Sequence, residues 1–243
     1  LDFNDEVLLG SDFLTDKVVN YVFTALPQHQ IPNKEKEPVI IENVKELARV
    51  LENVSATNKV QLFNSLWTKA SEDNLNKAAD FIYSNYLKSL ATETNKSELL
   101  KKIETQNRLR LGAIAPEITW NEGSSTKKLS DLTGAKNYVI VFWSSTCSHC
   151  LQQLPEFHKN LKGISNIEVL AIGLEDDDVT WKKESAKLPG FIHGIALGKW
   201  ESPYADIYDI HQTPTYYILD NEKRIVARPD DYQEVVKFLK GNN

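Results

Sequence analysis

The chain has 243 residues, a formal net charge of −6 and an isoelectric point near 5.5. Nucleic acid and anionic membrane surfaces are therefore not expected as main partners, because both select basic patches. No run of residues approaches the roughly 18 consecutive apolar residues of a transmembrane helix. No basic segment with an apolar core opens the sequence either. The length allows two domains.

The first hundred residues predict mostly helix. Apolar residues recur at helical spacing in residues 12–26 and 40–54, and three more amphipathic segments follow in residues 58–71, 73–90 and 96–111. The charged, proline-bounded residues 27–38 predict a loop. We expect an all-α helical domain over residues 1–108, packed as a small bundle. No residues in it have catalytic spacing, although the bundle could serve as a docking surface.

The two cysteines of the chain, Cys147 and Cys150, are separated by only two residues. The preceding apolar residues 138–143 have the composition of a strand, and residues 151–161 carry apolar side chains at helical spacing. The cysteines are therefore predicted on a strand-to-helix turn. A helix N-terminus favours the thiolate, which is the nucleophile in disulfide exchange. Cys147 is predicted to attack, and Cys150 to resolve mixed disulfides.

His149 lies between the two cysteines. Its imidazolium or its N–H can stabilise the Cys147 thiolate, which lowers the pKa of that thiol and favours the reduced form. A C-x-x-C motif can also supply half of a tetrahedral zinc site. No further cysteine exists, and the other histidines lack ligand spacing, so neither a metal nor a cofactor is expected. These histidines are His29, His158, His193 and His211.

The residues around the cysteines resemble the active-site segment of the thioredoxin superfamily. The matching residues are Phe142, Trp143, Cys147, Cys150 and Pro155, the last at the place of the family's helix-kinking proline. Thr213–Pro214 resembles the family's Thr-Pro signature, in which a cis-proline faces the cysteine pair. The resemblance covers about residues 109–240. It implies an α/β, thioredoxin-like three-layer fold with a central mixed sheet.

The predicted domain of residues 109–243 contains core strands at 138–143, 168–173 and 215–219. Residues 224–227 should pair antiparallel, and residues 232–239 should form the closing helix. Extra length around residues 173–191 leaves room for an inserted strand and helix. This insertion and the lead-in of residues 109–120 resemble reductases of the TlpA and ResA type.

The resemblance implies a thiol-disulfide oxidoreductase, and it implies roles for several residues of this chain. Pro214 would align the substrate and keep metals from the cysteines. Thr146, Ser148 and Thr213, with Trp143, would contact a substrate segment bound beside Cys147, added as a short strand. The TlpA and ResA group further implies a periplasmic, cell-envelope reductase with protein substrates and an upstream redox partner, and a membrane tether in the full-length protein is compatible with it.

Two departures from the family pattern stand out. Thr146 occupies the place of a second tryptophan in many relatives, so the surface beside Cys147 is smaller and more polar. Val141 stands where thioredoxin has a buried aspartate that helps to deprotonate the second cysteine. Glu175 is the candidate for this proton transfer, and the alternative is a solvated carboxylate in an acidic run.

Several functional alternatives stay open. Peroxidase activity is not expected, because Ser144 stands where peroxiredoxins need a threonine. The TlpA and ResA resemblance favours a reductase, whereas the histidine between the cysteines resembles oxidases and isomerases. The competing class is a redox-sensitive protein-binding module with little turnover.

Overall fold

The computed structural model describes residues 12–24 and 32–241. The chain forms two compact units, one ending at Ile103 and the other beginning at Glu104. This division falls inside helix α7 (Ser97–Leu109), a few residues before the boundary predicted from the sequence. The last turns of α7 therefore belong to the second unit.

The first unit is helical, as predicted. Its helices are α2 (Asp12–Thr24), α3 (Asn33–Val50), α4 (Ala56–Glu72), α5 (Asn76–Ile82) and α6 (Lys88–Glu93), and the π-helical segment η1 (Tyr83–Leu87) joins α5 to α6. Helix α4 contacts α2, α5 and α6. The apolar stripes of these helices meet in a single core, which includes Leu14, Val44 and Leu66 at 0 % exposure.

The loop predicted over residues 27–38 is wrong for its second half, because α3 begins at Asn33. Residues 27–31 lie outside the described residues. Pro32 immediately precedes the helix, where its fixed φ is compatible with helix entry. Pro38 removes only one intrahelical hydrogen bond. The buried Glu37 accepts the backbone N–H of Lys77 at 2.6 Å, a tertiary contact that the local sequence does not reveal.

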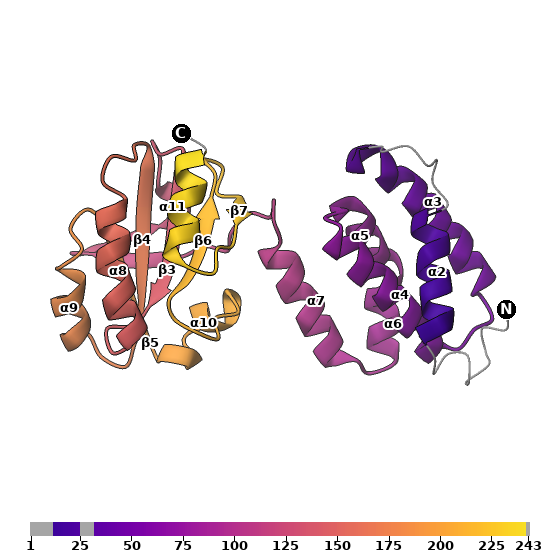
Figure 1. Ribbon diagram of the computed structural model, residues 1–243. Coiled ribbons are helices and arrows are strands. Elements are labelled where there is room, and N and C mark those ends of the chain that lie inside the picture. The colour runs from indigo at the N-terminus through magenta and orange to yellow at the C-terminus, as the bar shows by residue number, and fades with distance from the viewer. Residues whose placement is uncertain (1–11, 25–31, 242–243) are drawn as a thin grey trace. The chain divides into compact units, whose positions relative to one another are not determined.

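The second unit contains a five-stranded mixed sheet in the order β5-β4-β3-β6-β7, which confirms the predicted fold class (Figure 1). Its strands are β3 (Asn137–Trp143), β4 (Ile167–Glu175), β5 (Ile192–Leu197), β6 (Thr215–Leu219) and β7 (Ile225–Ala227). Strands β3, β4 and β5 are parallel, and β6 and β7 are antiparallel to their neighbours. A hairpin of β1 (Thr119–Glu122) and β2 (Ser125–Lys128) precedes the sheet.

The helices of this unit are α8 (Ser148–Asn160), α9 (Val179–Ser185), α10 (Pro203–Ile207) and α11 (Tyr232–Gly241). Alternate residues of β3 enter two separate cores. Val139, Val141 and Trp143 pack with α8 and α11, which lie together in front of the sheet in Figure 1. Tyr138, Ile140 and Phe142 pack with α10 and the lead-in on the other face. The sheet is thus buried on both sides, as a three-layer fold requires.

The inserted segment after β4 forms α9 and is followed by β5. Trp181 of α9 lies so close to β4 that a Cβ on Gly173 would be 2.4 Å from its ring, which explains the glycine at this strand position. The short α10, which follows β5, was not predicted. Proline at its first position and Ser202, whose side chain accepts the Ala205 N–H, stabilise its start.

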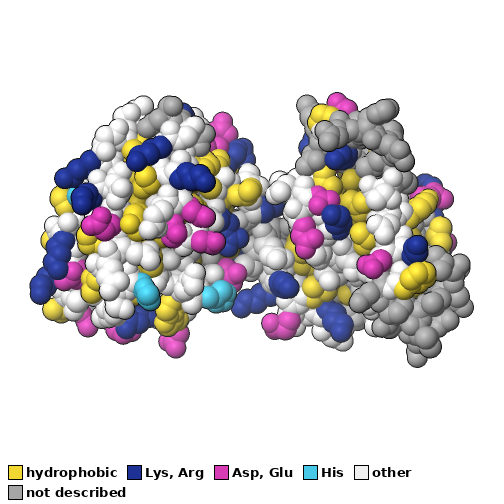
Figure 2. Space-filling view, in the orientation of Figure 1, with side chains coloured by type: hydrophobic (Ala, Val, Ile, Leu, Met, Phe, Trp, Pro, Cys, Tyr) yellow, Lys and Arg dark blue, Asp and Glu magenta, His cyan; other side chains and the backbone are white. Residues whose placement is uncertain are grey.

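The surface mixes charges of both signs. On the face shown in Figure 2, Lys and Arg side chains are interspersed with Asp and Glu. Several ion pairs of the described residues join side chains three or four positions apart in the sequence, such as Lys45 and Glu42 at 2.7 Å. Such exposed pairs contribute little to stability. None of the described helices is both long enough and apolar enough to cross a membrane.

Candidate active site

Cys147 occupies the position immediately before α8, at the end of the turn that follows β3. Its backbone N–H donates to the Ser144 carbonyl at 3.1 Å, which closes the turn. Its sulfur accepts the backbone N–H of Cys150 at 3.4 Å and so caps the helix. The sulfur therefore lies at the positive end of a helix, where a negative charge is stabilised. This is the strand-turn-helix placement that the sequence predicts.

The Thr-Pro motif lies beside this cysteine. The Thr213–Pro214 peptide bond is cis, and the Cys147 thiol donates to the Thr213 carbonyl oxygen at 3.4 Å. Pro214 is buried, whereas Thr213 is partly exposed. The fold thus brings together two motifs that are 66 residues apart in the sequence. A backbone bound along Thr213 would run next to the sulfur.

The two thiols have contrasting environments, and both are reduced. Cys147 is partly exposed, whereas Cys150 is 0 % exposed and packs in the core between the sheet and α8. Burial raises the pKa of Cys150 to about 12. Partial burial also opposes ionisation of Cys147, but hydrogen bonding with the Thr213 side chain, with Cys150 and with the His149 backbone N–H brings the pKa of Cys147 below its ordinary value. Cys147 is therefore the more readily ionised thiol.

His149 and Ser148 lie on the exposed first turn of α8, and Thr146 is exposed on the preceding turn. The backbone N–H of His149 is among the groups that lower the pKa of Cys147. The Thr146 hydroxyl lies 3.1 Å from the Ser144 hydroxyl. These three exposed residues lie within two positions of Cys147 in the sequence.

Trp143 lies elsewhere than the sequence suggested. Its side chain is only 1 % exposed and packs in the core with Val139 and Val141. The reason is the alternation of β3, which directs this residue towards α8 rather than towards the surface. Trp143 supports the cysteine turn from below and does not present a surface to a substrate.

Glu175 ends β4 and is buried, with 2 % exposure. The alternative interpretation as a solvated carboxylate is therefore wrong. Its Oε1 accepts the Ser145 N–H at 2.5 Å, and its Oε2 accepts the Ser144 hydroxyl at 3.3 Å. Both partners lie in the turn before Cys147. Transfer of a proton from Cys150 to Glu175 stays a prediction.

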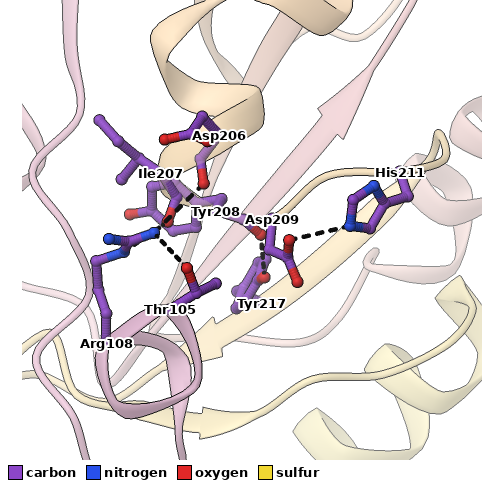
Figure 3. A network of polar contacts seen from close by, with 8 residues as sticks. All are labelled: Thr105, Arg108, Asp206, Ile207, Tyr208, Asp209, His211 and Tyr217. Carbon is purple, nitrogen blue, oxygen red and sulfur yellow. Dashed lines mark hydrogen bonds and ion pairs between the residues drawn. The ribbon is translucent and has the colours of Figure 1, made fainter. Parts of the chain in front are cut away.

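Of the polar residues beside Pro214, the sequence analysis named only His211, as a histidine without ligand spacing. A hollow of roughly 210 Å³ lies beside Pro214, and its walls include His211, Arg228 and Asp230. Figure 3 shows His211 directed towards Asp209, with Nε2 2.9 Å from the carboxylate. No spacing rule marks this set, because its members come from separate loops. In the described residues, no group of three or more His, Cys, Asp or Glu side chains could hold a metal ion.

Part of the chain is similar to a known protein family. Residues 111–228 match the AhpC/TSA family. This match covers 118 of the 243 residues, a little under half of the chain, and the C-terminal domain has a thioredoxin-like fold. A thioredoxin-like protein from Bacteroides caccae shares the fold with a TM-score of 0.54, at 16 % identity over 90 % of this chain and 97 % of its own. The family match confirms the predicted class, a redox enzyme that acts through thiols.

Two other solved structures match a little over half of this chain. A domain of a possible thiol-disulfide isomerase from Cytophaga hutchinsonii is 31 % identical over 55 % of this chain and 93 % of its own, with a TM-score of 0.47. The thioredoxin domain of a thiol-disulfide oxidoreductase from Bacteroides vulgatus is 24 % identical over 54 % and 99 %, also with a TM-score of 0.47. Among curated proteins, none matches the chain.

Proposed function

We propose that this protein is a thiol-disulfide oxidoreductase of the bacterial cell envelope, similar to the TlpA and ResA group, that reduces disulfides in protein substrates. The observation that carries the proposal is the asymmetry of the two thiols. Cys147 is accessible, caps α8 and has a lowered pKa, whereas Cys150 is buried beneath it with a raised pKa. An exposed nucleophile above a protected resolving thiol is the arrangement that stepwise disulfide exchange needs.

In the first step, the Cys147 thiolate attacks one sulfur of a substrate disulfide. A mixed disulfide forms, the substrate S–S bond breaks, and the other substrate sulfur leaves as a thiolate that takes a proton from solvent. Cys150 then loses its proton and attacks the Cys147 sulfur, which releases the second substrate thiol. Two electrons have passed to the substrate, and the Cys147–Cys150 disulfide remains. A dithiol of an upstream redox partner restores the reduced pair.

The surface beside Thr213 supports a polypeptide as the substrate. The partly exposed Thr213 offers its backbone beside the nucleophilic sulfur, and an extended segment could pair with it as an added strand. Thr146 and Ser148 would contact that segment from the side of α8, and Pro214 would fix its path. His149 would raise the reduction potential by stabilising the Cys147 thiolate.

The deciding measurement is the reduction potential of the Cys147/Cys150 pair in the full chain, by thiol trapping across glutathione ratios. A value near or below about −250 mV supports the reductase, and one above about −180 mV supports an oxidase or isomerase of the same chemistry. Cys147→Ser should abolish insulin reduction, whereas Cys150→Ser should still attack and accumulate mixed disulfides. Substantial turnover by Cys147→Ser, or no intramolecular disulfide in the wild type, would overturn the proposal in favour of a binding module.

A further inference from the structure

The carboxylate of Glu175 lies directly beneath the turn that carries the nucleophile. Strand β4 pairs with β3 in parallel, so the ends of both strands meet at one edge of the sheet. Glu175 is the last residue of β4, and its own carbonyl accepts the Gly198 N–H at 2.9 Å, which fixes its backbone against the residue after β5. The backbone of Glu175 is therefore fixed, and its side chain points towards the residues that follow β3.

Two hydrogen bonds link this carboxylate to the turn. Oε1 accepts the buried Ser145 N–H at 2.5 Å, and Oε2 accepts the Ser144 hydroxyl at 3.3 Å. The Ser144 hydroxyl also accepts the Thr146 N–H at 3.3 Å, and the Ser144 carbonyl accepts the Cys147 N–H at 3.1 Å. One carboxylate thus constrains each residue of the turn, directly or through Ser144.

Glu175 differs from its acidic neighbours in the partners of its side chain. Asp176 and Asp178 are exposed enough to pair with Lys199 and Lys182. Within the described residues, the hydrogen-bond partners of the Glu175 side chain are Ser144 and Ser145, and Cys150 is not among them. A carboxylate is costly to bury unless hydrogen bonds replace its water. Those bonds here come from the turn.

We infer that Glu175 is a positioning residue, which holds the Ser144–Thr146 turn so that the Cys147 sulfur stays on the N-terminus of α8 and beside Thr213. The inference rests on the proposed function for its consequence, because the turn matters only if Cys147 reacts. It differs from the sequence-based role of Glu175 as a proton acceptor for Cys150. A positioning carboxylate acts through its acceptor oxygens, whereas a proton acceptor acts through its basicity.

The substitution Glu175→Gln separates the two roles. An amide oxygen can still accept the Ser145 N–H, but an amide cannot take up the Cys150 proton. Glu175→Ala removes both functions and leaves the buried Ser145 N–H without a partner. Ser144→Ala removes one of the two hydrogen bonds with less risk to folding. Glu201→Gln, at an exposed carboxylate in the short segment that follows β5, is the matched control for loss of charge.

The experiment measures two rates on each full-length variant: alkylation of Cys147 by iodoacetamide as a function of pH, and insulin reduction. With Glu175→Ala we expect at least a tenfold loss in both rates and a rise in the pKa of Cys147, because a small displacement of a reacting group can cost about 100-fold. Glu175→Gln should recover most of that loss, to within about threefold of the wild type, since the acceptor returns. Ser144→Ala should lie between them.

Equal losses in Glu175→Gln and Glu175→Ala, with normal Cys147 alkylation and accumulation of mixed disulfide, would overturn positioning and favour proton transfer. Wild-type behaviour of Glu175→Ala would overturn both roles. If Glu175→Ala does not fold, Ser144→Ala decides: an unchanged pKa of Cys147 in that variant contradicts the inference. A wild type that exchanges no disulfides, but whose Cys147 alkylation still depends on Glu175, would remove the proposed function and leave the positioning role intact.

Discussion

Each of the two units buries one glutamate that accepts backbone N–H groups from a distant segment. In the helical unit, Glu37 of α3 accepts the N–H groups of Lys77 and Ala78, at the start of α5. In the thioredoxin-like unit, Glu175 of β4 accepts the N–H of Ser145. Both side chains replace lost water by protein donors, as buried carboxylates must. The local chemistry is the same, but the segments that they hold differ.

The difference lies in what surrounds each carboxylate. Glu37 is the one buried charged or polar residue among the described residues of the helical unit, and its contact caps a helix within an apolar core. Around Glu175, Ser144 and Ser145 are buried as well, and both lie shortly before Cys147, the proposed nucleophile. A single buried carboxylate thus stabilises packing, whereas a cluster of buried polar groups marks a site where geometry is held for chemistry.

Alkylation of the reduced wild type tests whether that cluster creates chemical asymmetry. At neutral pH we expect iodoacetamide to modify Cys147 at least about 100-fold faster than Cys150, because the thiolate reacts and the pKa of Cys150 is raised to about 12. The Cys147 rate should rise with pH and reach its plateau early, with a midpoint on the acid side of the ordinary thiol value of 9.0, since the pKa of Cys147 is lowered. Peptide mass spectrometry gives both rates.

Unfolding in guanidinium provides the control, because it removes helix, burial and hydrogen bonds from both sulfurs. The two rates should then converge and follow the pH dependence of an ordinary thiol. Similar rates in the folded protein, or a Cys147 midpoint at or above the ordinary value, would show that the turn confers no special reactivity.

The substitution Glu37→Ala tests the helical side of the comparison. It leaves the N–H groups of Lys77 and Ala78 without their acceptor, so the free energy of unfolding should fall by about 1–2 kcal/mol. The reduction potential should not change, because no redox group lies in that core. Urea denaturation followed by circular dichroism gives the stability, and Glu42→Gln at an exposed position is the control. A shift in the potential would break the distinction between the two carboxylates.

The sequence predicted most elements whose cause is local. Apolar periodicity located the helices α2 to α7, and β-branched runs located β3, β4 and β6, since these patterns follow from which side of each element is buried. The exceptions depend on tertiary contacts. The first turns of α3 contain a proline and several charges, and they are helical with Glu37 bonded to a segment 40 residues away. The short α10 carries no periodic signal.

The candidate site shows the same limit. Cys147 and Cys150 were recognisable from their spacing between a predicted strand and a predicted helix, and Thr213–Pro214 from its resemblance to the family's Thr-Pro signature. Glu175 was selected from its position near a strand end, but its partners Ser144 and Ser145 could not be named, since a strand register decides which residues meet. The surface role of Trp143 failed for a related reason: the face to which a strand's last residue points depends on the pairing.

The network in Figure 3 contains the opposite kind of contact: Glu175 is an acceptor for a backbone N–H, whereas Arg108 is a cationic donor to backbone carbonyl groups. Arg108, at the end of α7, donates from Nε to the Ile207 carbonyl at 2.9 Å and from Nη2 to the Asp206 carbonyl at 3.3 Å, at the last turn of α10. Because Arg108 is partly buried, Arg108→Ala should lower the free energy of unfolding by about 1 kcal/mol. His211→Ala breaks the exposed pair with Asp209 and should cost under about 0.5 kcal/mol.

Urea denaturation of both variants, followed by tryptophan fluorescence, gives the two stabilities, and the reduction potential gives the functional readout. We expect neither variant to move the potential, because the hydrogen bonds of the two side chains within the described residues go to residues 105, 206, 207 and 209 and not to the turn of Ser144 to Cys147. If His211→Ala lowered the free energy of unfolding more than Arg108→Ala, burial would not be what determines how much these polar contacts stabilise the protein. A shifted potential for Arg108→Ala would show that residues near α10 also influence the redox pair. Polar contacts that only stabilise packing could then not be separated from those that serve the chemistry, which is the distinction drawn between Glu37 and Glu175.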